Sequence, residues 1–310
     1  MYMSKLRIIF MGTPEFAVSS LQKLVESGCN VVAVVTAPDK PAGRGLQLTP
    51  SPVKHYAVAQ GIPVLQPEKL KNPAFLEELR SYQADLQVVV AFRMLPEVVW
   101  NMPPKGTFNL HASLLPQFRG AAPINWAIIN GETETGVTTF FLEHEIDTGN
   151  IIFQETEPIH YEDNVGSLYE RLMHKGAELV VRTVNAVEAG NYPQLPQSQS
   201  EVLKAAPKIF KETCEINWNQ STEAVRNFIR GLSPYPAAWT TLNGKLCKIY
   251  KSSVATQIPT DNGSHLFTDN KHLLLFKTAD GWLSIDELQL EGKKRMGIEE
   301  FLRGTKITIA

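Results

Sequence analysis

Continuous apolar runs alternate with amphipathic segments over the first half of the chain. The runs at residues 6–11, 30–35 and 85–91 are short and rich in branched side chains, which predicts buried strands. The segments at residues 53–60 and 74–81 repeat apolar positions at helical spacing. Strands buried on both faces need crossover helices, so the alternation predicts an α/β fold with a doubly wound, mostly parallel, Rossmann-like sheet.

The pattern continues as far as a long helix. Further strands are predicted at residues 62–65, 107–111 and 137–142, and helices at residues 123–130 and 165–188. The long helix carries apolar residues at helical spacing, namely Leu168, Leu172, Val180, Val184 and Val187. We therefore assign residues 1–189 to one α/β domain.

The character of the sequence changes after residue 189. Residues 190–207 contain three prolines and a polar run, which is typical of a linker. One helix at residues 221–230 then precedes several strand-like runs, with hairpin turns expected at Asn243-Gly244 and Asp280-Gly281. Residues 208–310 are therefore predicted to form a smaller, OB-like β-barrel domain.

Composition places the chain among globular proteins. Its 310 residues are 43% apolar, which excludes intrinsic disorder. Three cysteines lie far apart and provide neither a disulfide framework nor zinc-ligand spacing, which favours a reducing compartment. We find no signal peptide and no apolar run long enough to span a membrane, and we expect a cytoplasmic protein.

The net charge of −2 conceals an asymmetry between the two predicted domains. Residues 208–310 carry 14 Lys and Arg against 11 Asp and Glu, whereas residues 1–207 carry 16 against 21. The near-neutral total therefore does not exclude a nucleic-acid partner for the C-terminal domain. It does predict modest electrostatic affinity.

The turn after the first predicted strand is Gly12-Thr13-Pro14-Glu15-Phe16. A dinucleotide-binding fold would carry three glycines here, and two of them are missing, so a pyrophosphate could not approach the backbone closely. This disfavours an NAD-dependent oxidoreductase. The simplest role is a strand-to-helix turn, with Thr13 as N-cap and Pro14 at the first helical position.

Two residues on one predicted strand point to acyl-transfer chemistry. Asn109 and His111 are two positions apart and therefore share a face. An imidazole can accept a proton, and a carboxamide can donate to a developing oxyanion. Taken alone, a His hydrogen-bonded in the core is the commoner case. Asp147, in a turn-like loop before Gly149, could orient the imidazole or could simply be a turn residue.

Three segments in chain order resemble the folate-dependent formyltransferase family. They are Asn109-x-His111, Ser113-Leu114-Leu115-Pro116 and Asp147-Thr148-Gly149, and the resemblance extends to Phe228-x-x-Gly231-Leu232-x-Pro234-x-Pro236-x-Ala238-Trp239. It implies transfer of a formyl group from 10-formyltetrahydrofolate to an amine without a metal. In that scheme His111 accepts a proton, Asp147 orients and stabilises it, and Asn109 stabilises the oxyanion.

The resemblance also implies binding residues. Ser113, Leu114, Leu115 and Pro116 are expected to contact the folate, although the two leucines could equally be core residues. The chain departs from the family pattern at Ala112, where glycine is usual, and in residues 91–96, which are one residue short and carry Arg93 where glycine is frequent.

Residues 38–53 narrow the choice of acceptor. The run Pro38-Asp39-Lys40-Pro41-Ala42-Gly43-Arg44-Gly45 resembles a loop of the members that act on initiator methionyl-tRNA. Members that act on glycinamide ribonucleotide or sugar nucleotides lack that loop. The resemblance implies that this loop holds the tRNA acceptor end, with Arg44 gripping a phosphate or base. It also implies a tRNA-binding C-terminal domain and a monomer.

Two alternatives remain at this level. In the first, the formyl acceptor is a small amine or a nucleotide sugar. Residues 38–53 and the basic C-terminal domain argue against this alternative. A pure RNA-binding protein with a degenerate α/β domain is the other, and it leaves Asn109, His111 and Asp147 unexplained.

Overall fold

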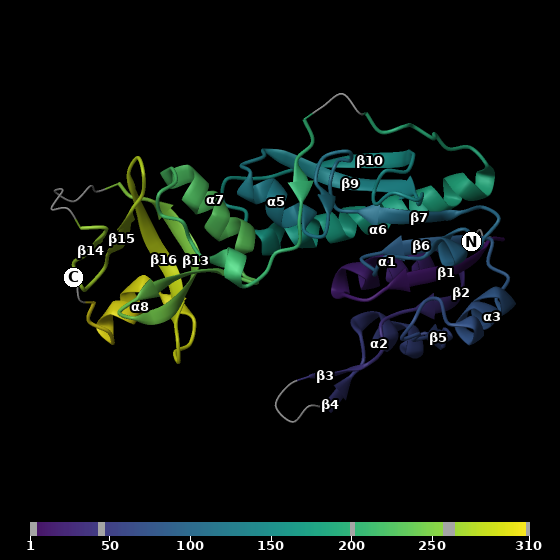
Figure 1. Ribbon diagram of the computed structural model, residues 1–310, viewed down its shortest axis with the longest axis horizontal. Helices are drawn as coiled ribbons and strands as arrows, with labels where there is room; N and C mark the ends of the chain where they lie inside the picture. The colour runs from purple at the N-terminus through teal and green to yellow at the C-terminus, as the bar shows by residue number, and fades with distance from the viewer. Residues whose placement is uncertain (1–4, 43–46, 199–201, 257–263, 308–310) are drawn as a thin grey trace. The chain divides into compact units, whose positions relative to one another are not determined.

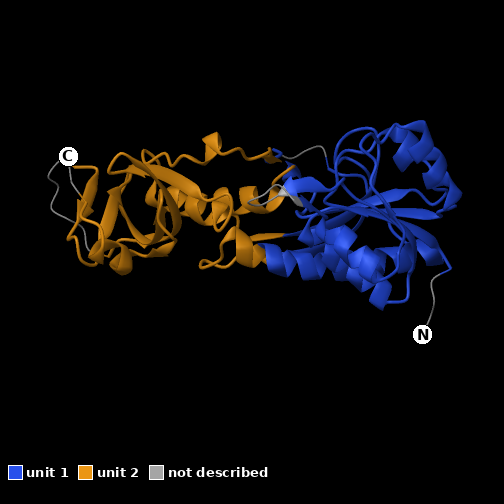
Figure 2. Cartoon of the chain, turned by 90° about the horizontal axis from the view of Figure 1, so that it is seen from below, with its two compact units in different colours: residues 1–120, 136–157, 169–204 blue, residues 121–135, 158–168, 205–310 orange. Residues whose placement is uncertain are grey.

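The structure, a computed structural model, describes residues 5–42, 47–198, 202–256 and 264–307. The chain forms two compact units, shown in separate colours in Figure 2. Unit 1 comprises residues 1–120, 136–157 and 169–204, and unit 2 comprises residues 121–135, 158–168 and 205–310. Two short segments of the predicted N-terminal domain, residues 121–135 and 158–168, thus belong to the same compact unit as residues 205–310.

A seven-stranded sheet organises unit 1 (Figure 1), in the order β10-β9-β7-β6-β1-β2-β5. The strands are β1 (Arg7–Gly12), β2 (Asn30–Val35), β5 (Val64–Leu65), β6 (Leu86–Val90), β7 (Thr107–His111), β9 (Glu134–Phe141) and β10 (Ile151–Pro158). Five neighbouring strands are parallel, namely β5, β2, β1, β6 and β7. Strand β9 pairs with β7 in the antiparallel direction. The predicted doubly wound, mostly parallel sheet is confirmed.

Sequence patterning did not predict β10. Its first three residues are apolar, but the remainder, Gln154-Glu155-Thr156-Glu157, is polar. A strand with polar side chains on an outer position of a sheet lacks the apolar run or strict alternation that marks buried strands.

Helices bury the faces of this sheet. They are α1 (Glu15–Glu26), α2 (Pro52–Ala59), α3 (Pro73–Ser81), α4 (Glu97–Trp100) and α6 (Val165–Ala189). On one face, Ile9, Met11 and Val89 pack with Phe75 and Leu79 of α3. Helix α6 packs closely on the other face of the sheet. A Cβ atom on its Gly176 would lie only 2.7 Å from Leu110 Cδ2.

Local signals set where the helices begin. Ser51 caps α2 by accepting from the Lys54 N–H at 3.0 Å, and Asn72 caps α3 by accepting from the Ala74 N–H at 2.9 Å. The expectation for α1 was wrong by one position: Pro14 is the N-cap and Thr13 lies before it. Proline supplies no side-chain cap, so the extended backbone at Pro14 simply turns the chain into the helix.

Residues 38–53 contain a hairpin that the sequence pattern did not predict, formed by β3 (Lys40–Ala42) and β4 (Gln47–Thr49). Asp39 anchors the base of this hairpin: its two carboxylate oxygens accept from Lys54 Nζ at 2.6 Å and from Gln66 Nε2 at 2.8 Å. Hydrogen bonds from Lys54 and Gln66 hold the pKa of Asp39 below its usual value.

No helix in the described parts of the chain is long and apolar enough to cross a membrane.

Unit 2 is built on an antiparallel sheet in the order β12-β13-β16-β15-β14, with β17 paired to β16. Its strands are β12 (Ala238–Leu242), β13 (Lys245–Val254), β14 (Leu266–Thr268), β15 (Leu274–Lys277), β16 (Trp282–Leu290) and β17 (Met296–Gly297), with the two-residue β11 (Ala205–Ala206) apart. Its helices are α5 (Pro123–Ile129), α7 (Thr222–Leu232), α8 (Ile298–Arg303) and a 3-10 turn at Glu212–Cys214. This small β domain matches the predicted class.

The two predicted hairpin turns differ in outcome. Asn243 and Gly244, both with positive φ, form the two-residue turn between β12 and β13, as expected. Between β15 and β16, however, Lys277 pairs with Trp282, so Asp280-Gly281 occupies half of a four-residue loop. Asp280 Oδ1 is drawn instead to the start of α7, where it accepts from the Thr222 N–H at 2.7 Å.

Candidate active site

Three parallel strands of unit 1 end at the same level. Gly12 of β1 is in register with Val90 of β6, and Val90 with Leu110 of β7. The chain leaves β1 for β2 on one side and reaches β6 on the other, which makes this edge a topological switch point. In open α/β sheets, ligands bind at the carboxyl ends of strands at such a point. His111, the last residue of β7, lies there.

Gly12 is required for close packing of the turn at this edge. A Cβ atom on Gly12 would lie 2.6 Å from Ala17 Cβ and 3.0 Å from the Val90 carbonyl oxygen. Gly12 stands where a dinucleotide fingerprint has a glycine, and here it allows α1 to pack closely against the sheet.

His111 is buried, and its ring is oriented by a backbone carbonyl. Its Nε2 lies 2.9 Å from the carbonyl oxygen of Phe118. A carbonyl oxygen only accepts, so Nε2 carries the proton in this contact. The neutral imidazole then has its lone pair on Nδ1.

Asp147 faces that lone pair. Its Oδ2 lies 4.0 Å from His111 Nδ1 and accepts from the Gly120 N–H at 3.1 Å. The His111–Asp147 distance is too long for a hydrogen bond but suits an ion pair once Nδ1 is protonated. The carboxylate is thus placed to stabilise an imidazolium, while the Phe118 carbonyl orients the ring.

The backbone at Asp147 is unusual. Its φ is +55°, a conformation that non-glycine residues adopt only when their surroundings require it. Gly149 follows, and a Cβ atom there would lie 1.7 Å from the Phe141 carbonyl oxygen. Gly149 therefore has a steric cause, whereas the backbone of Asp147 is held in its conformation by its surroundings.

Asn109 lies two residues before His111 on β7, on the same face of the strand. It is half-buried, and among the described residues its carboxamide forms no hydrogen bond. The amide is therefore available to a bound molecule near the ends of the strands.

The four residues predicted to contact folate form a tight loop after β7. Ser113 is fully buried and its hydroxyl donates to the Gln117 carbonyl at 2.6 Å. Leu115 packs with Phe140 and Ile151 in the core. Leu114 and Pro116 are half-buried. Folate contact by these four residues remains a prediction, with Leu114 and Pro116 the more accessible.

This loop is held by two polar side chains that sequence reasoning missed. Thr138 Oγ1 donates to the Ser113 carbonyl at 2.6 Å and accepts from the Leu115 N–H at 3.2 Å. Gln154 Nε2 lies 2.9 Å from the Leu115 carbonyl oxygen. Both come from the antiparallel strands β9 and β10, which no local pattern ties to residues 113–116.

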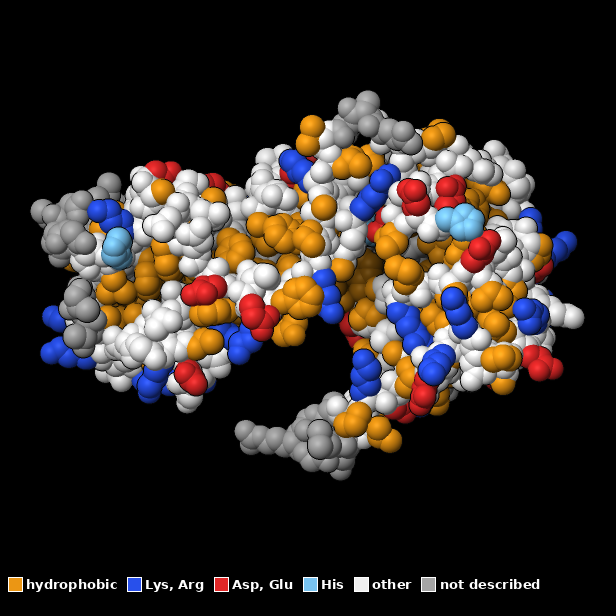
Figure 3. Space-filling view, in the orientation of Figure 1, with side chains coloured by type: hydrophobic (Ala, Val, Ile, Leu, Met, Phe, Trp, Pro, Cys, Tyr) orange, Lys and Arg blue, Asp and Glu red, His pale blue; other side chains and the backbone are white. Residues whose placement is uncertain are grey.

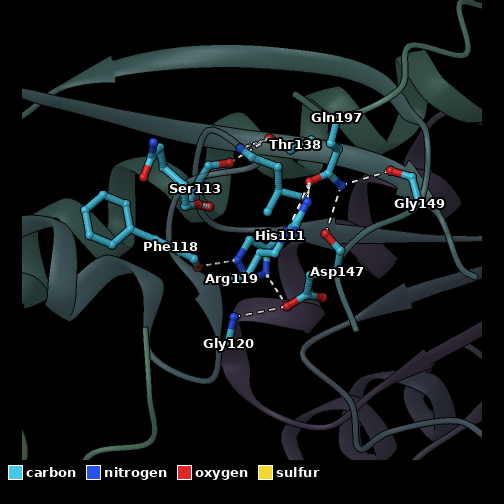
Figure 4. A network of polar contacts seen from close by, with 11 residues as sticks. His111, Ser113, Phe118, Arg119, Gly120, Thr138, Asp147, Gly149 and Gln197 are labelled. Atoms are coloured by element: carbon cyan, nitrogen blue, oxygen red, sulfur yellow. Dashed lines mark hydrogen bonds and ion pairs between the residues drawn. The ribbon is translucent and has the colours of Figure 1, made fainter. Parts of the chain in front are cut away.

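Sequence reasoning also missed the roles of Arg119 in β8 (Arg119–Gly120) and of Gln197, which lies in the predicted linker. Gln197 Oε1 accepts from Arg119 Nε at 3.1 Å and Nη2 at 2.5 Å, and its Nε2 donates to the Asp147 and Gly149 carbonyls. Figure 4 shows this network around His111. The only sequence signal was the adjacency of Arg119 to the predicted site.

Two other predicted features have separate outcomes. Arg44 falls outside the described residues. Arg93, the departure from the family pattern, donates from Nη1 to the Glu68 carbonyl at 2.9 Å and from Nη2 to the Pro67 carbonyl. It therefore ties the segment after β6 to the segment after β5.

Unit 2 contains a basic pocket of its own, with a volume of about 560 Å³. Its charged lining is Lys208, Lys211 and Lys248, and its aromatic lining is Tyr235 and Trp239. Amines beside aromatic rings are the chemistry that single-stranded nucleic acid binds. Elsewhere acidic and basic side chains are interspersed on the visible face (Figure 3).

Within the described residues, no cluster of three or more His, Cys, Asp or Glu is placed to hold a metal ion.

Known proteins match both parts of this chain. Residues 5–184 match the family model described as formyl transferase, and residues 208–306 match the model of its C-terminal domain. The chain is 58% identical to a methionyl-tRNA formyltransferase of Parabacteroides distasonis, covering 97% of this chain and 96% of the relative. It is 56% identical to one of Bacteroides fragilis, covering 98% and 97%.

Among solved structures, the fold is similar to that of HypX from Aquifex aeolicus in complex with tetrahydrofolic acid. The TM-score is 0.66 at 21% identity, over 98% of this chain and 49% of that one. Near-complete coverage at more than half identity is decisive: the chain belongs to the methionyl-tRNA formyltransferase family.

Proposed function

We propose that this protein transfers the formyl group of 10-formyltetrahydrofolate to the α-amine of initiator methionyl-tRNA. The observation that carries the proposal is the state of His111. Its Nε2–H is engaged by the Phe118 carbonyl, and its Nδ1 lone pair faces the Asp147 carboxylate across 4.0 Å. Such a group is placed to accept a proton, and the nearby carboxylate can pair with the imidazolium that results.

Proton removal is the task that the acceptor requires. An amine that attacks a formyl carbon becomes positively charged and must lose a proton before the product is stable. His111 Nδ1 can accept that proton, directly or through a water, because no described residue forms a hydrogen bond with this nitrogen. Asp147 then forms an ion pair with the imidazolium. That imidazolium can return the proton to N10 of the folate as the bond between the formyl carbon and N10 breaks, so that tetrahydrofolate leaves.

Oxyanion stabilisation is assigned to Asn109. The folate, when bound, supplies the electrophilic formyl carbon. Its carbonyl oxygen gains negative charge during attack, and the carboxamide of Asn109, which has no partner among the described residues, can donate to it. The residues present at the edge of the sheet therefore fit a formylated folate as co-substrate.

Binding of tRNA is assigned to two regions. One is the β3–β4 hairpin, whose base Asp39 secures through Lys54 and Gln66. The other is the lysine-lined pocket of unit 2. We also propose a monomer as the working form, as the family resemblance implies; sedimentation velocity tests this directly.

The decisive experiment incubates the protein with 10-formyltetrahydrofolate and charged initiator tRNA. We expect N-formylmethionyl-tRNA, detected after mild deacylation as formylmethionine. Formylation of a nucleotide sugar or a small amine, with none of the tRNA, would contradict the proposal and would assign the site to another acceptor.

A further inference from the structure

Gln197 joins two parts of the polar network around His111. We infer that Gln197 is a positioning residue for formyl transfer, which holds the Asp147 carboxylate against His111 by clamping the loop that carries it. The inference rests on the proposed function. It assigns a catalytic consequence to a residue of the polar segment that follows α6.

The contacts of Gln197 use its whole amide group. Nε2 donates to the Asp147 carbonyl at 2.8 Å and to the Gly149 carbonyl at 2.9 Å, so it engages both ends of the Asp147-Thr148-Gly149 turn. Oε1 accepts two hydrogen bonds from Arg119. A primary amide has two N–H donors and one oxygen with two lone pairs, and all four are used.

Three consecutive residues close the network from the other side. Phe118 accepts from His111 Nε2 through its carbonyl, Arg119 binds Gln197, and the Gly120 N–H donates to Asp147 Oδ2. A ring of contacts therefore links His111 through residues 118–120 to Gln197 and Asp147 (Figure 4). Gln197 fixes the backbone of Asp147, and Gly120 fixes its carboxylate.

The Asp147 backbone needs such a clamp. A left-handed conformation at a non-glycine residue is unfavourable and persists where neighbours impose it. The partners that restrain this turn come from Gln197, 48 to 50 residues away in the chain. The carbonyls of Asp147 and Gly149 are held by one side chain, so its removal would release both.

The segment that carries Gln197 is itself held to the sheet. Leu195 forms two backbone hydrogen bonds with Ile151 of β10, at 2.8 and 3.0 Å. Gln197 follows two residues later, so its position is set by the edge of the same sheet that carries His111. The residue therefore acts from a defined location.

The test compares Gln197→Ala and Gln197→Glu with wild type in the full chain. The glutamate variant keeps the length of the side chain and its bond to Arg119, but presents an oxygen to the two carbonyls. We expect both variants to lower kcat about 10- to 100-fold, because a displacement near 1 Å at a reacting group has that effect. KM for folate and for tRNA should change by less than about threefold.

Gln194→Ala is the matched control, since Gln194 is exposed in the same segment and, within the described part of the chain, forms no hydrogen bond. It should leave kcat unchanged. Melting temperatures of all variants separate positioning from loss of fold. A wild-type kcat in Gln197→Glu would overturn the inference.

A double-mutant cycle with Asp147→Asn distinguishes positioning from a merely structural role. If Gln197 acts through the Asp147 carboxylate, Gln197→Ala should lower kcat by less than about threefold further in the Asp147→Asn background. A full additional loss there would overturn the inference. If the wild-type protein makes no N-formylmethionyl-tRNA, the proposed function fails; if it does and the variants match it, only the inference fails.

Discussion

At the scale of single residues, the site depends on which atoms each side chain has left available. The imidazole of His111 is oriented by the Phe118 carbonyl and faces the Asp147 carboxylate with its other nitrogen. Asn109, on the same face of β7, keeps its carboxamide unengaged among the described residues. One group can take a proton and the other can stabilise an oxyanion.

We therefore expect His111→Ala and Asn109→Ala each to lower kcat by about 100-fold or more, since a general base contributes about 10²–10⁴ and an oxyanion donor about 10²–10³. Steady-state kinetics of N-formylmethionyl-tRNA formation measures the effect. His174→Ala is the control, because His174 is exposed on α6. Near-normal turnover in either site variant would refute the assigned role.

At the scale of secondary-structure elements, an ion-pair cluster ties β10 to α6. Glu157 of β10 is nearly buried, and its carboxylate accepts from Arg171 Nε at 2.7 Å and lies 3.0 Å from Lys175 Nζ. Burial by itself raises the pKa of Glu157, but the hydrogen bonds and charges of Arg171 and Lys175 outweigh it and lower the pKa. One turn separates the two cations on α6, so a single carboxylate binds both.

Glu157→Gln should lower the free energy of unfolding at pH 7 by about 1–3 kcal/mol, because two cations lose a charged acceptor. The lowered pKa means that the folded state binds the proton less tightly than the unfolded state. The stabilisation is therefore complete above the ordinary glutamate pKa and is lost as the pH falls through the lowered value.

Urea unfolding of the wild type and of Glu157→Gln at pH 7 and near pH 3 measures this loss. The difference in unfolding free energy between the two proteins should shrink at acidic pH. Glu155→Gln is the matched control, because Glu155 and Arg182 form an exposed pair at 2.6 Å that contributes less than about 1 kcal/mol. Equal losses in the two variants would contradict the prediction.

At the scale of the whole molecule, the small net charge of −2 is made of acidic and basic groups spread unevenly along the chain. Lys208, Lys211 and Lys248 gather in the pocket of unit 2 beside Tyr235 and Trp239. Electrostatic affinity for RNA should therefore come from a few contacts rather than from bulk charge.

Replacing the three pocket lysines with alanine should raise KM for tRNA at least about tenfold and leave KM for folate unchanged, because only the tRNA carries phosphates to this unit. Replacement of Lys293 and Lys294, which lie outside the pocket, provides a control of similar charge. Equal effects on both substrates would contradict the assignment.

The salt dependence of the same KM gives a second measurement. The slope of log KM for tRNA against log salt should correspond to fewer than about six phosphate contacts. A steeper slope would show that bulk electrostatics dominates binding.

Periodicity and local chemistry determined much of this protein. The apolar runs predicted the strands β1, β2 and β6 because such runs are stable only between covering layers, and the Asn243-Gly244 pair predicted its turn because both positions need positive φ. Asn109 and His111 could be placed on one face because a strand repeats every two residues.

Tertiary structure alone decided which atoms meet. The Phe118 carbonyl at His111, the Gly120 N–H at Asp147 and the amide of Gln197 across the Asp147 turn join segments 7 to 50 residues apart. Such contacts follow from the order of the strands and the path of the loops, and no local pattern encodes them. For that reason the sequence indicated the reacting groups, whereas their orientation, and with it the candidate role of Gln197, emerged only from the folded chain.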